Sequence, residues 1–380
     1  MNQAAIIPFN RPFMTGRELA YIARAHERGQ LAGDGSFTEQ CHQWLQRSTG
    51  CHQALLTHSC TAALEMAAIL GEFGEGDEII MPSFTFVSTA NAFVLRGATP
   101  VFVDIREDTL NIDESLIEAA VTERTRAIVV MHYAGVSCEM DVIMDVANRH
   151  GLMVIEDAAH SILSSYRGRP LGSIGDLGTL SFHETKNVIS GEGGALLLNR
   201  PELVERAEII REKGTNRSQF FRGQVDKYSW VDIGSSYLPS EMVAAFLWAQ
   251  LEEAEQITGR RLAVWSRYHS AFEPLEEASL VRRPRIPPGC VHGAHMYYLL
   301  LPDAAARTAF IENLRDKGVG TVFHYVPLHN SPMASRLGLG PRSLPVTEAS
   351  SERLVRLPLW LGIEDHQERV IDAVFEVLEN

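Results

Sequence analysis

Residues 126–161, "RAIVVMHYAGVSCEMDVIMDVANRHGLMVIEDAAHS", decide the fold class of this chain. Two short β-rich apolar runs, at 126–133 and 152–159, flank a segment with helical periodicity. The apolar residues run on continuously instead of alternating with polar ones, which is typical of strands that are covered on both faces. The stretch therefore predicts strands of a parallel α/β sheet with a helix between them.

The same rhythm continues on both sides of this stretch. Further strands are predicted at 77–82, 99–104, 178–183 and 194–199, and helices within 56–70, 86–98 and 240–257. The helix within 56–70 follows a turn with hydroxyl side chains, and the chain is polar and irregular from about 211 to 240. These elements predict a large domain built on a mainly parallel sheet.

The pattern changes after residue 257. The runs 295–301, 305–318 and 319–325 are short and indicate a smaller unit that mixes strands and helices. We therefore expect two domains, a large α/β domain over residues 1–255 and a small α+β domain over residues 256–380.

The composition excludes several classes of protein. The 380 residues carry a formal net charge of −14, which argues against a general binder of nucleic acid or of acidic membranes but is compatible with a local basic patch. The five cysteines are scattered, without a CxxC pair or a Cys/His cluster, so we expect reduced thiols, no metal site and a cytoplasmic protein. Residues 1–14 lack a signal-peptide pattern, and no apolar run reaches membrane-spanning length.

One lysine stands at the end of a predicted strand. Lys186 follows the strand 178–183, and His132 and Asp157 stand at the ends of two others. Ligands of open parallel sheets bind at the carboxyl ends of the strands, and a lysine partly removed from water is available as an amine nucleophile. A lysine at such a position is nevertheless more often a surface residue on a turn. The functional interpretation therefore depends on the neighbours of Lys186.

Asp157 is such a neighbour. It ends the apolar part of "VIEDAAHS" (154–161), where it either caps the following helix or faces a ligand. A buried carboxylate at a strand end can hold a proton on a ring nitrogen, and pyridoxal 5′-phosphate (PLP) needs this pairing to accept electrons. Glu156 should point to the opposite face of the strand.

A phosphate and an aromatic ring need contacts of their own. Ser59, Cys60 and Thr61 stand where the helix within 56–70 begins, and the free N–H groups and helix dipole at such a place bind phosphate. An ordinary Ser/Thr cap is the alternative. Phe84 and Phe86 follow the strand 77–82, and either ring could stack on a pyridine, although each alone is more often a core residue.

The order of these signals resembles a known family. The stretches "SCTAALEMAA" (59–68), "PSFTFVSTANA" (82–92), "VIEDAAHS" (154–161), "SFHETKNVISGEGG" (181–194) and "HYVPLHNSP" (324–332) are similar to those of the DegT/DnrJ/EryC1 sugar-nucleotide aminotransferases. The resemblance covers nearly the whole chain. It implies the PLP-dependent fold type I, like that of aspartate aminotransferase, with a large parallel-dominated sheet domain and a smaller C-terminal α+β domain. It also implies a homodimer or a higher homo-oligomer.

The resemblance implies roles for individual residues. Lys186 would carry PLP as a Schiff base and transfer protons, and Asp157 would pair with the pyridine nitrogen. His160 stands where many relatives have glutamine and would contact the ring oxygen or Asp157. The other implied cofactor contacts are those of Cys60, Thr61 and Ser181 with the phosphate and of Phe86 with the ring.

The resemblance also implies a substrate. Residues 206–241 are similar to the branch of the family that aminates C4 of dTDP-4-keto-6-deoxy-D-glucose with L-glutamate, giving dTDP-4-amino-4,6-dideoxy-D-galactose. Residues 211–227 carry five basic and two acidic side chains, a net of +3, which suits a nucleoside diphosphate; a solvated charged loop is the alternative. The expected substrate contacts are Arg217, Arg222, Tyr237 in the subunit-crossing segment 234–237, His324, Tyr325 and His329.

Other functions fit the sequence less well. Dehydratases of the family that lack the lysine carry histidine in its place, so Lys186 disfavours them, whereas a C3 aminotransferase would retain Lys186. A nicotinamide-dependent sugar oxidoreductase would need GxGxxG after the first strand, and this motif is absent. A non-catalytic homologue would not need both Asp157 and Lys186. The amino sugar could serve a surface polysaccharide or a glycosylated metabolite.

Overall fold

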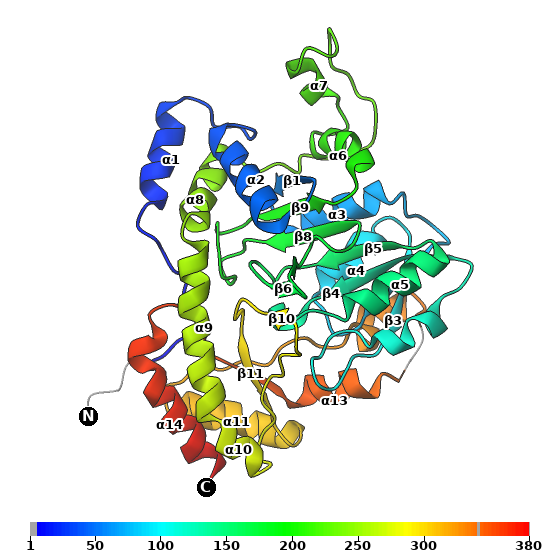
Figure 1. Cartoon of the computed structure of the whole chain (residues 1–380). Coiled ribbons are helices and arrows are strands. Elements are labelled where there is room, and N and C mark those ends of the chain that lie inside the picture. Colours follow the sequence, from blue (N-terminus) through cyan, green and yellow to red (C-terminus); the bar gives the residue numbers. More distant parts are fainter. Residues whose placement is uncertain (1–5, 340–342, 380) are drawn as a thin grey trace.

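The computed structural model describes residues 6–339 and 343–379, and its main feature is a seven-stranded sheet (Figure 1). The strand order is β1-β9-β8-β5-β4-β2-β3. The strands are β1 (Gln53–Thr57), β2 (Glu78–Pro82), β3 (Thr99–Val103), β4 (Thr125–Met131), β5 (Met153–Asp157), β8 (Leu177–Ser181) and β9 (Gly194–Leu198). All six strands predicted for the large domain are present, and β1 is an addition.

The sheet is mostly parallel, as predicted, and departs from this pattern at one strand. β3, β2, β4, β5 and β8 pair in parallel, whereas β9 is antiparallel to both β8 and β1. The segment between β8 and β9 contains turns and no crossover helix. A short connection of this kind can join only antiparallel strands, because parallel neighbours require a long crossover.

Helices cover both faces of the sheet, which explains the continuous apolar runs. Ile79 on β2 packs in a cluster with α3 (Cys60–Leu70), α4 (Val87–Val94) and α6 (Val204–Arg211). Its neighbour Ile80 packs in a second cluster with α5 (Met140–His150) on the other face. A third cluster joins β1, β8 and β9 to α2 (Ser36–Thr49) and α8 (Glu241–Leu251). The predicted α/β fold is therefore confirmed.

The helix predicted at 240–257 consists of two helices. α8 begins after Ser240, whose side chain accepts a hydrogen bond from Val243 N, and ends at Leu251. α9 (Ala254–Ala271) then continues away from the sheet to the other end of the molecule (Figure 1). The connection is Glu252–Glu253, which contains neither proline nor glycine.

A second core lies at that end of the molecule. β11 (Tyr297–Leu300) pairs antiparallel with β12 (Leu354–Leu357), and both pack with α9, α11 (Ala304–Asp316) and α14 (Gln367–Leu378). The run 319–325 forms only isolated bridges, such as Val322 with Arg356. Ile7, near the N-terminus, belongs to the same core. The division at residues 255 and 256 stays a prediction.

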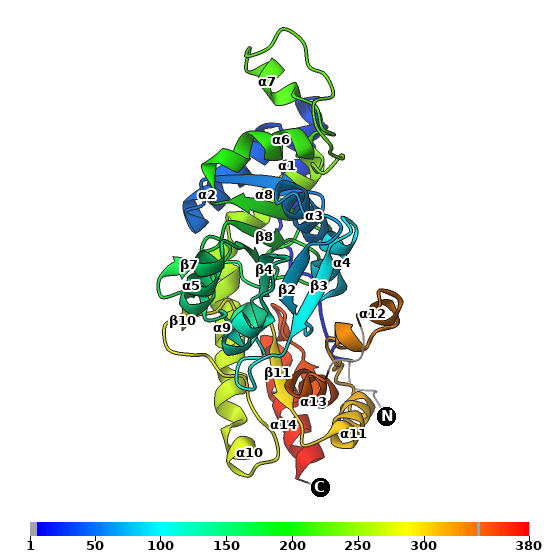
Figure 2. The same cartoon turned by 90° about the vertical axis from the view of Figure 1, so that its right-hand side faces the viewer.

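The remaining elements are peripheral. α1 (Glu18–Glu27) lies beside α8. α7 (Arg217–Phe221) lies on an extension, residues 211–235, that projects beyond α6 (Figures 1 and 2). The shorter elements are β6 (Ser165–Tyr166), β7 (Arg169–Pro170), β10 (Cys290–Val291), α10 (Glu273–Glu277), α12 (Pro332–Arg336) and α13 (Pro345–Arg353). Within residues 6–339 and 343–379, no helix is long and apolar enough to cross a membrane. The signal-peptide expectation concerned residues 1–14, of which 1–5 lie outside the described residues.

Candidate active site

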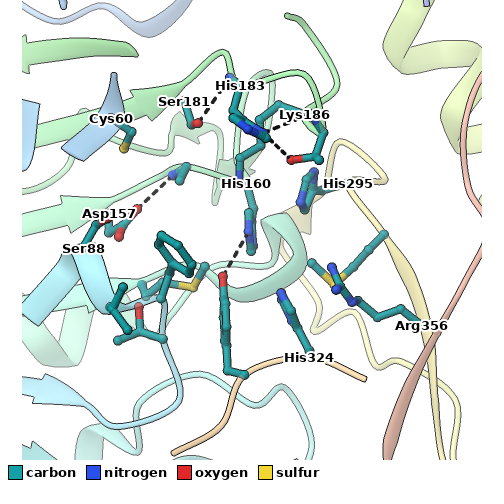
Figure 3. Close-up of a pocket in the computed structure, with 18 of the residues that line it drawn as sticks. Cys60, Ser88, Asp157, His160, Ser181, His183, Lys186, His295, His324 and Arg356 are labelled. Atoms are coloured by element: carbon teal, nitrogen blue, oxygen red, sulfur yellow. Dashed lines mark hydrogen bonds between the residues drawn. The ribbon is translucent and has the colours of Figure 1, made fainter. Parts of the chain in front are cut away.

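A cavity of about 820 Å³ opens at the carboxyl ends of the parallel strands (Figure 3). Met131, Asp157 and Ser181, the last residues of β4, β5 and β8, line its floor. Residues of the second core, including His295 and Arg356, line the facing wall. The cavity therefore lies where the strand order predicted a ligand site, and it is closed by a part of the chain far away in the sequence.

Lys186 lies in this cavity on a loop that folds back on itself. Phe182 N donates to Gly193 O (2.8 Å), Glu184 N donates to Gly191 O (2.9 Å), and Lys186 N donates to His183 O (2.9 Å). Burial lowers the pKa of Lys186 to about 8, although the nearby Cys60 and Asp157 act in the opposite direction. A substantial fraction of the amine is therefore uncharged just above neutral pH, as a nucleophile or proton acceptor requires.

Asp157 is 4% exposed and faces the same cavity. Its Oδ2 accepts from Thr89 Oγ1 (2.7 Å), and its Oδ1 accepts from Ala159 N (3.2 Å). Burial raises the pKa of this carboxyl group, and the two hydrogen bonds oppose the shift. Thr89 is itself paired with Thr85 (2.7 Å) at the start of α4. A cation beside Asp157 would stabilise its charged form.

Glu156 points to the opposite face, as predicted. Its carboxylate accepts from Gly172 N (2.8 Å), Ile174 N (2.6 Å) and Gly175 N (2.6 Å). His132 Nε2 lies 2.9 Å from Glu156 Oε2, and Cys138 N donates to His132 Nδ1, so Nε2 carries the ring proton. His132, although it follows a strand end, therefore contributes to a buried structural network and does not line the cavity.

The first turn of α3 also lines the cavity. Ser59 is the N-cap, and its hydroxyl accepts from Ala62 N (3.1 Å), which is the ordinary capping role. Cys60 and Thr61 follow, with N–H groups for which the helix supplies no acceptor. Thr61 Oγ1 lies 2.8 Å from Ser88 Oγ on α4. These groups, together with Ser181, form a polar cradle suited to an anion such as phosphate.

Gly194 explains why glycine ends the segment "GEGG". A Cβ built on Gly194 would lie 2.4 Å from both Cys60 N and Ser59 C. The start of β9 therefore passes directly against the turn that begins α3. This close backbone contact keeps the first turn of α3 beside the end of β8, where Ser181 lies.

His160 and the two candidate phenylalanines have different surroundings. The His160 ring stacks on His295 at 4.1 Å, and its Nε2 lies 3.3 Å from Tyr325 OH (Figure 3). His160 Nδ1 is buried without a hydrogen-bond partner. Phe86 lines the cavity and is 57% exposed, whereas Phe84 is 1% exposed and belongs to the core.

Two of the six expected substrate residues line the cavity. His324 and Tyr325 are adjacent on its wall, and His324 Nδ1 lies 2.8 Å from Tyr133 OH. His329 is 4% exposed and lies between Ser83 (2.6 Å) and Glu348 (3.1 Å), so both its ring nitrogens have partners away from the cavity.

The other three expected substrate residues belong to the region 206–241. Tyr237 is 7% exposed, packs in the cluster that contains α3, and stacks on His58. Arg217 and Arg222 form ion pairs with Glu212 (3.3 Å) and with Glu208 of α6 (2.7 Å), respectively. None of the three lines the cavity of its own chain.

Several residues in and behind the cavity wall were not predicted from the sequence. Ser88 lines the cavity, and Thr89 is buried behind it and donates to Asp157. Both fall inside the quoted stretch "PSFTFVSTANA", where hydroxyl groups at the start of a helix were an available signal. His295 and Arg356 gave no such signal, because both lie in β-rich segments of the second core. No group of three or more metal-binding side chains occurs among the described residues.

Comparisons with known proteins agree with this site. Residues 12–375 match the DegT/DnrJ/EryC1/StrS aminotransferase family. The chain is 34% identical over 382 residues to the spore coat polysaccharide biosynthesis protein SpsC of Bacillus subtilis, covering 98% of this chain and 97% of SpsC. Its structure is similar to the aminotransferase TlmJ from Streptoalloteichus hindustanus (30% identity, 99% of each chain, TM-score 0.91). It is also similar to Spr1654 from Streptococcus pneumoniae in its pyridoxamine-phosphate (PMP) form (26% identity, 98% and 99% coverage, TM-score 0.91).

Proposed function

The chain belongs to the DegT/DnrJ/EryC1/StrS aminotransferase family, and on this basis we propose that it moves the amino group of L-glutamate to C4 of a nucleotide-linked 4-keto-6-deoxy sugar. It is a PLP-dependent sugar aminotransferase. The sugar that we propose is dTDP-4-keto-6-deoxy-D-glucose, and the product dTDP-4-amino-4,6-dideoxy-D-galactose. The similarity of residues 206–241 to this branch of the family supports that choice.

The residues of the cavity fit PLP. The buried Nδ1 of His160 lacks a partner, and an oxygen on a ligand ring would satisfy it. The carboxylate of Asp157 is buried with Lys186 as a nearby cation, and a protonated pyridine nitrogen would place a further positive charge beside it. The first-turn N–H groups of Cys60 and Thr61 suit the phosphate.

We assign the proton transfers to Lys186. When bound, PLP supplies an electron sink and carries the amino group between the two substrates. The Lys186 amine, with a pKa of about 8, can take the proton from the α-carbon of the donor and can later deliver one to C4 of the sugar. Asp157 holds the proton on the ring nitrogen, and Phe86 and Tyr325 supply an apolar wall.

One observation supports PLP-dependent chemistry at this site, whereas the choice of C4 rests on the similarity of residues 206–241. The buried carboxylate of Asp157 and the amine of Lys186 line one cavity with the free first turn of α3. An aminotransferase acting at C3, or a dehydratase, would retain much of this cavity and would differ in its product.

Two measurements test the proposal. The purified protein should be yellow, and L-glutamate alone should bleach this colour. The bleached protein should then be offered dTDP-linked and UDP-linked 4-keto-6-deoxy sugars and a 3-keto sugar, and the products assigned by NMR. A 4-amino product with the galactose configuration supports the proposal. A 3-amino product or loss of a sugar hydroxyl contradicts it.

We also propose that the protein is a homodimer in which the extension 211–235 reaches the partner's cavity. The exposure of Phe221 (69%) and Trp230 (79%) on this extension supports a contact with a second copy. Arg217 and Arg222 would then approach the diphosphate from the neighbouring subunit, because neither lines the cavity of its own chain.

A further inference from the structure

Two threonines at the start of α4 form a chain of hydroxyl groups that ends on Asp157. Thr89 Oγ1 donates to Asp157 Oδ2 (2.7 Å), and Thr85 Oγ1 lies 2.7 Å from Thr89 Oγ1. Both threonine side chains are buried, so water does not compete for these hydrogen bonds. A hydroxyl group has a single proton. Because Thr89 gives its proton to Asp157, its oxygen accepts the proton of Thr85.

The direction of this chain favours an ionised Asp157. Both hydroxyl protons point toward the carboxylate, and its other oxygen, Oδ1, accepts from Ala159 N (3.2 Å). An ionised carboxylate accepts all the hydrogen bonds offered to it, whereas a protonated one must place a proton of its own. Burial raises the pKa of Asp157, and the hydrogen bond from Thr89 is the largest influence in the opposite direction. The chain therefore offsets part of the cost of burying this charge.

The support from the hydroxyl groups differs from that of the charged neighbour. Lys186 also lowers the pKa of Asp157, but its own pKa is about 8, so the amine exists in both charge states near neutral pH. Lys186 is, moreover, the reacting amine. The two threonines carry no charge that changes, so they stabilise the carboxylate whatever the protonation state of Lys186.

The same hydroxyl pair joins the two sides of the first turn of α4. The N-cap residue, Phe86, makes no capping hydrogen bond with its side chain. Thr85 precedes Phe86, and Thr89 follows it in the first turn, where Thr89 N donates to Phe86 O (3.1 Å). Phe86 lines the cavity. The turn therefore sets the position of this aromatic ring relative to the carboxylate of Asp157.

We propose that Thr85 and Thr89 are positioning residues that keep Asp157 ionised and directed at the ring nitrogen of PLP throughout the reaction. Thr89 acts on Asp157 directly, and Thr85 acts through Thr89. The proposal concerns the cofactor of an aminotransferase of this family, and it holds whichever keto sugar receives the amino group.

The test compares Thr89→Val, which removes the hydroxyl group and nearly keeps the shape, with Thr89→Ser, which keeps the hydroxyl group. Thr347→Val is the matched control. Thr347 is equally buried and donates to another buried carboxylate, Asp104 Oδ1 (2.7 Å), but neither of these two residues lines the cavity. The protonation of the ring nitrogen is measured by nitrogen NMR on protein loaded with PLP that is isotopically labelled at this position. The rate of the glutamate half-reaction and the stability in urea are measured on the same proteins.

Thr89→Val should move the NMR signal from that of a protonated ring nitrogen toward that of a neutral one. It should also slow the glutamate half-reaction roughly ten- to hundredfold, as expected for the loss of a hydrogen bond to a charged group. Thr85→Val should act in the same direction but less strongly, and Thr89→Ser should resemble the wild type. Thr347→Val should lose stability without changing the NMR signal or the rate.

A double variant separates positioning from general damage. In Asp157→Asn protein the amide cannot hold the proton, so adding Thr89→Val should leave the NMR signal where Asp157→Asn alone puts it. A fully protonated ring nitrogen in Thr89→Val overturns the proposal, as does an equal change of the signal in Thr347→Val. If Thr89→Val does not fold, Thr85→Val is compared with Thr347→Val by the same criteria. The NMR measurement needs no sugar, so a protein that aminates no keto sugar would refute the proposed function and leave this result in place.

Discussion

Asp157 and Glu156 are adjacent on β5, yet the sheet gives their carboxylates opposite surroundings, because successive side chains of a strand point to opposite faces. Glu156 accepts three backbone N–H groups of the loop 172–175 and faces His132, so its hydrogen bonds are complete without a ligand. Asp157 accepts only two hydrogen bonds, from the Thr89 hydroxyl and from Ala159 N, and it faces the cavity. The buried charge of Asp157 is therefore stabilised fully only when a cationic ligand group arrives.

Asp157→Asn tests this role directly. The amide is similar in shape but cannot hold a proton on the ring nitrogen, so we expect turnover to fall roughly 10²- to 10³-fold, as for other groups that stabilise developing charge. Cofactor should remain bound through the cradle of α3 and Lys186. Steady-state kinetics measure the loss of turnover, and the absorbance spectrum shows whether the cofactor is still bound. Near-normal turnover by protein with full cofactor content would exclude Asp157 from the chemistry.

Lys186 offers a second test at this scale, through the stability of the cofactor-free protein. Burial lowers its pKa from the usual 10.5 to about 8, so the charged form is disfavoured in the folded state. The resulting destabilisation, up to roughly 3 kcal/mol, is complete below pH 8 and disappears as the pH rises from 8 to 10.5. Lys186→Met should therefore be more stable than the wild type at pH 7.

Urea unfolding of both cofactor-free proteins between pH 7 and 10 measures this difference. The advantage of Lys186→Met should shrink as the pH rises above 8, because the folded wild type then no longer carries the disfavoured charge and the release of its proton on folding costs less at higher pH. A difference that is independent of pH would mean that the amine is well solvated in the folded protein. The same variant should have no transaminase activity.

At the scale of the element, the predictable parts were those with a strong local pattern. β2, β3, β4 and β5 are continuous apolar runs bounded by polar or turn residues. β1 was missed because its five residues, "QALLT", run into a helix that is also rich in leucine and alanine. The local signal for strand and helix is the same in such a run, and only the pairing with β9 decides it.

The break between α8 and α9 also has a tertiary cause. Helical periodicity continues through Glu252 and Glu253, so the sequence predicted a single helix. α8 packs against α1 and α2, whereas α9 belongs to the second core. The two helices must take different directions to reach these different packing partners. No residue at the junction predicts this change of direction from the local sequence.

Gly194→Ala tests the contact between β9 and the first turn of α3. The added Cβ would meet backbone atoms of Ser59 and Cys60, which cannot rotate away, so the turn must shift. We expect a loss of roughly 1–3 kcal/mol in stability and weaker PLP binding. Gly259→Ala in α9 is the control, because nothing lies within 4 Å of its Cβ and it should stabilise by about 0.5–1 kcal/mol. Unchanged stability and PLP affinity in Gly194→Ala would refute this explanation.

At the scale of the whole molecule, the predictable half of the site was the half contributed by the sheet. The stretches 59–61, 157–160 and 181–186 each carry their own motif, and the sheet brings them together at one edge. Arg356 and His295 enter the cavity only because the second core packs against that edge. Conversely, His329 has a side chain suited to catalysis, but Ser83 and Glu348 already occupy its ring nitrogens.

The extension that carries α7 acts either in the site of its own chain or in the site of a second copy. It projects away from the rest of the chain (Figures 1 and 2). Its side chains Phe221, Tyr228 and Trp230 are exposed. Exposed aromatic groups of this kind are typical of an interface. If the extension completes the site of a second copy, Arg217 and Arg222 act on the partner's substrate and not on that of their own chain.

Mixing two defective variants distinguishes these cases. The double variant Arg217→Ala/Arg222→Ala should keep its glutamate half-reaction and lose most of its keto-sugar half-reaction, and Lys186→Ala should be inactive. In a hybrid dimer, an extension acting in the partner's site would join the arginines of one chain to the lysine of the other. Half of the dimers in an equal mixture would then hold one complete site, restoring about a quarter of wild-type activity.

The mixture must be unfolded and refolded together, since stable dimers exchange too slowly to form hybrids, and light scattering must report a dimer. Mixing Lys186→Ala with Asp157→Asn is the control, because both residues belong to the cavity of one chain and their hybrid contains no complete site. If the arginine mixture stays as inactive as this control, the extension acts within its own chain or does not bind the sugar nucleotide. In that case the net charge of +3 over 211–227 only keeps a surface loop solvated.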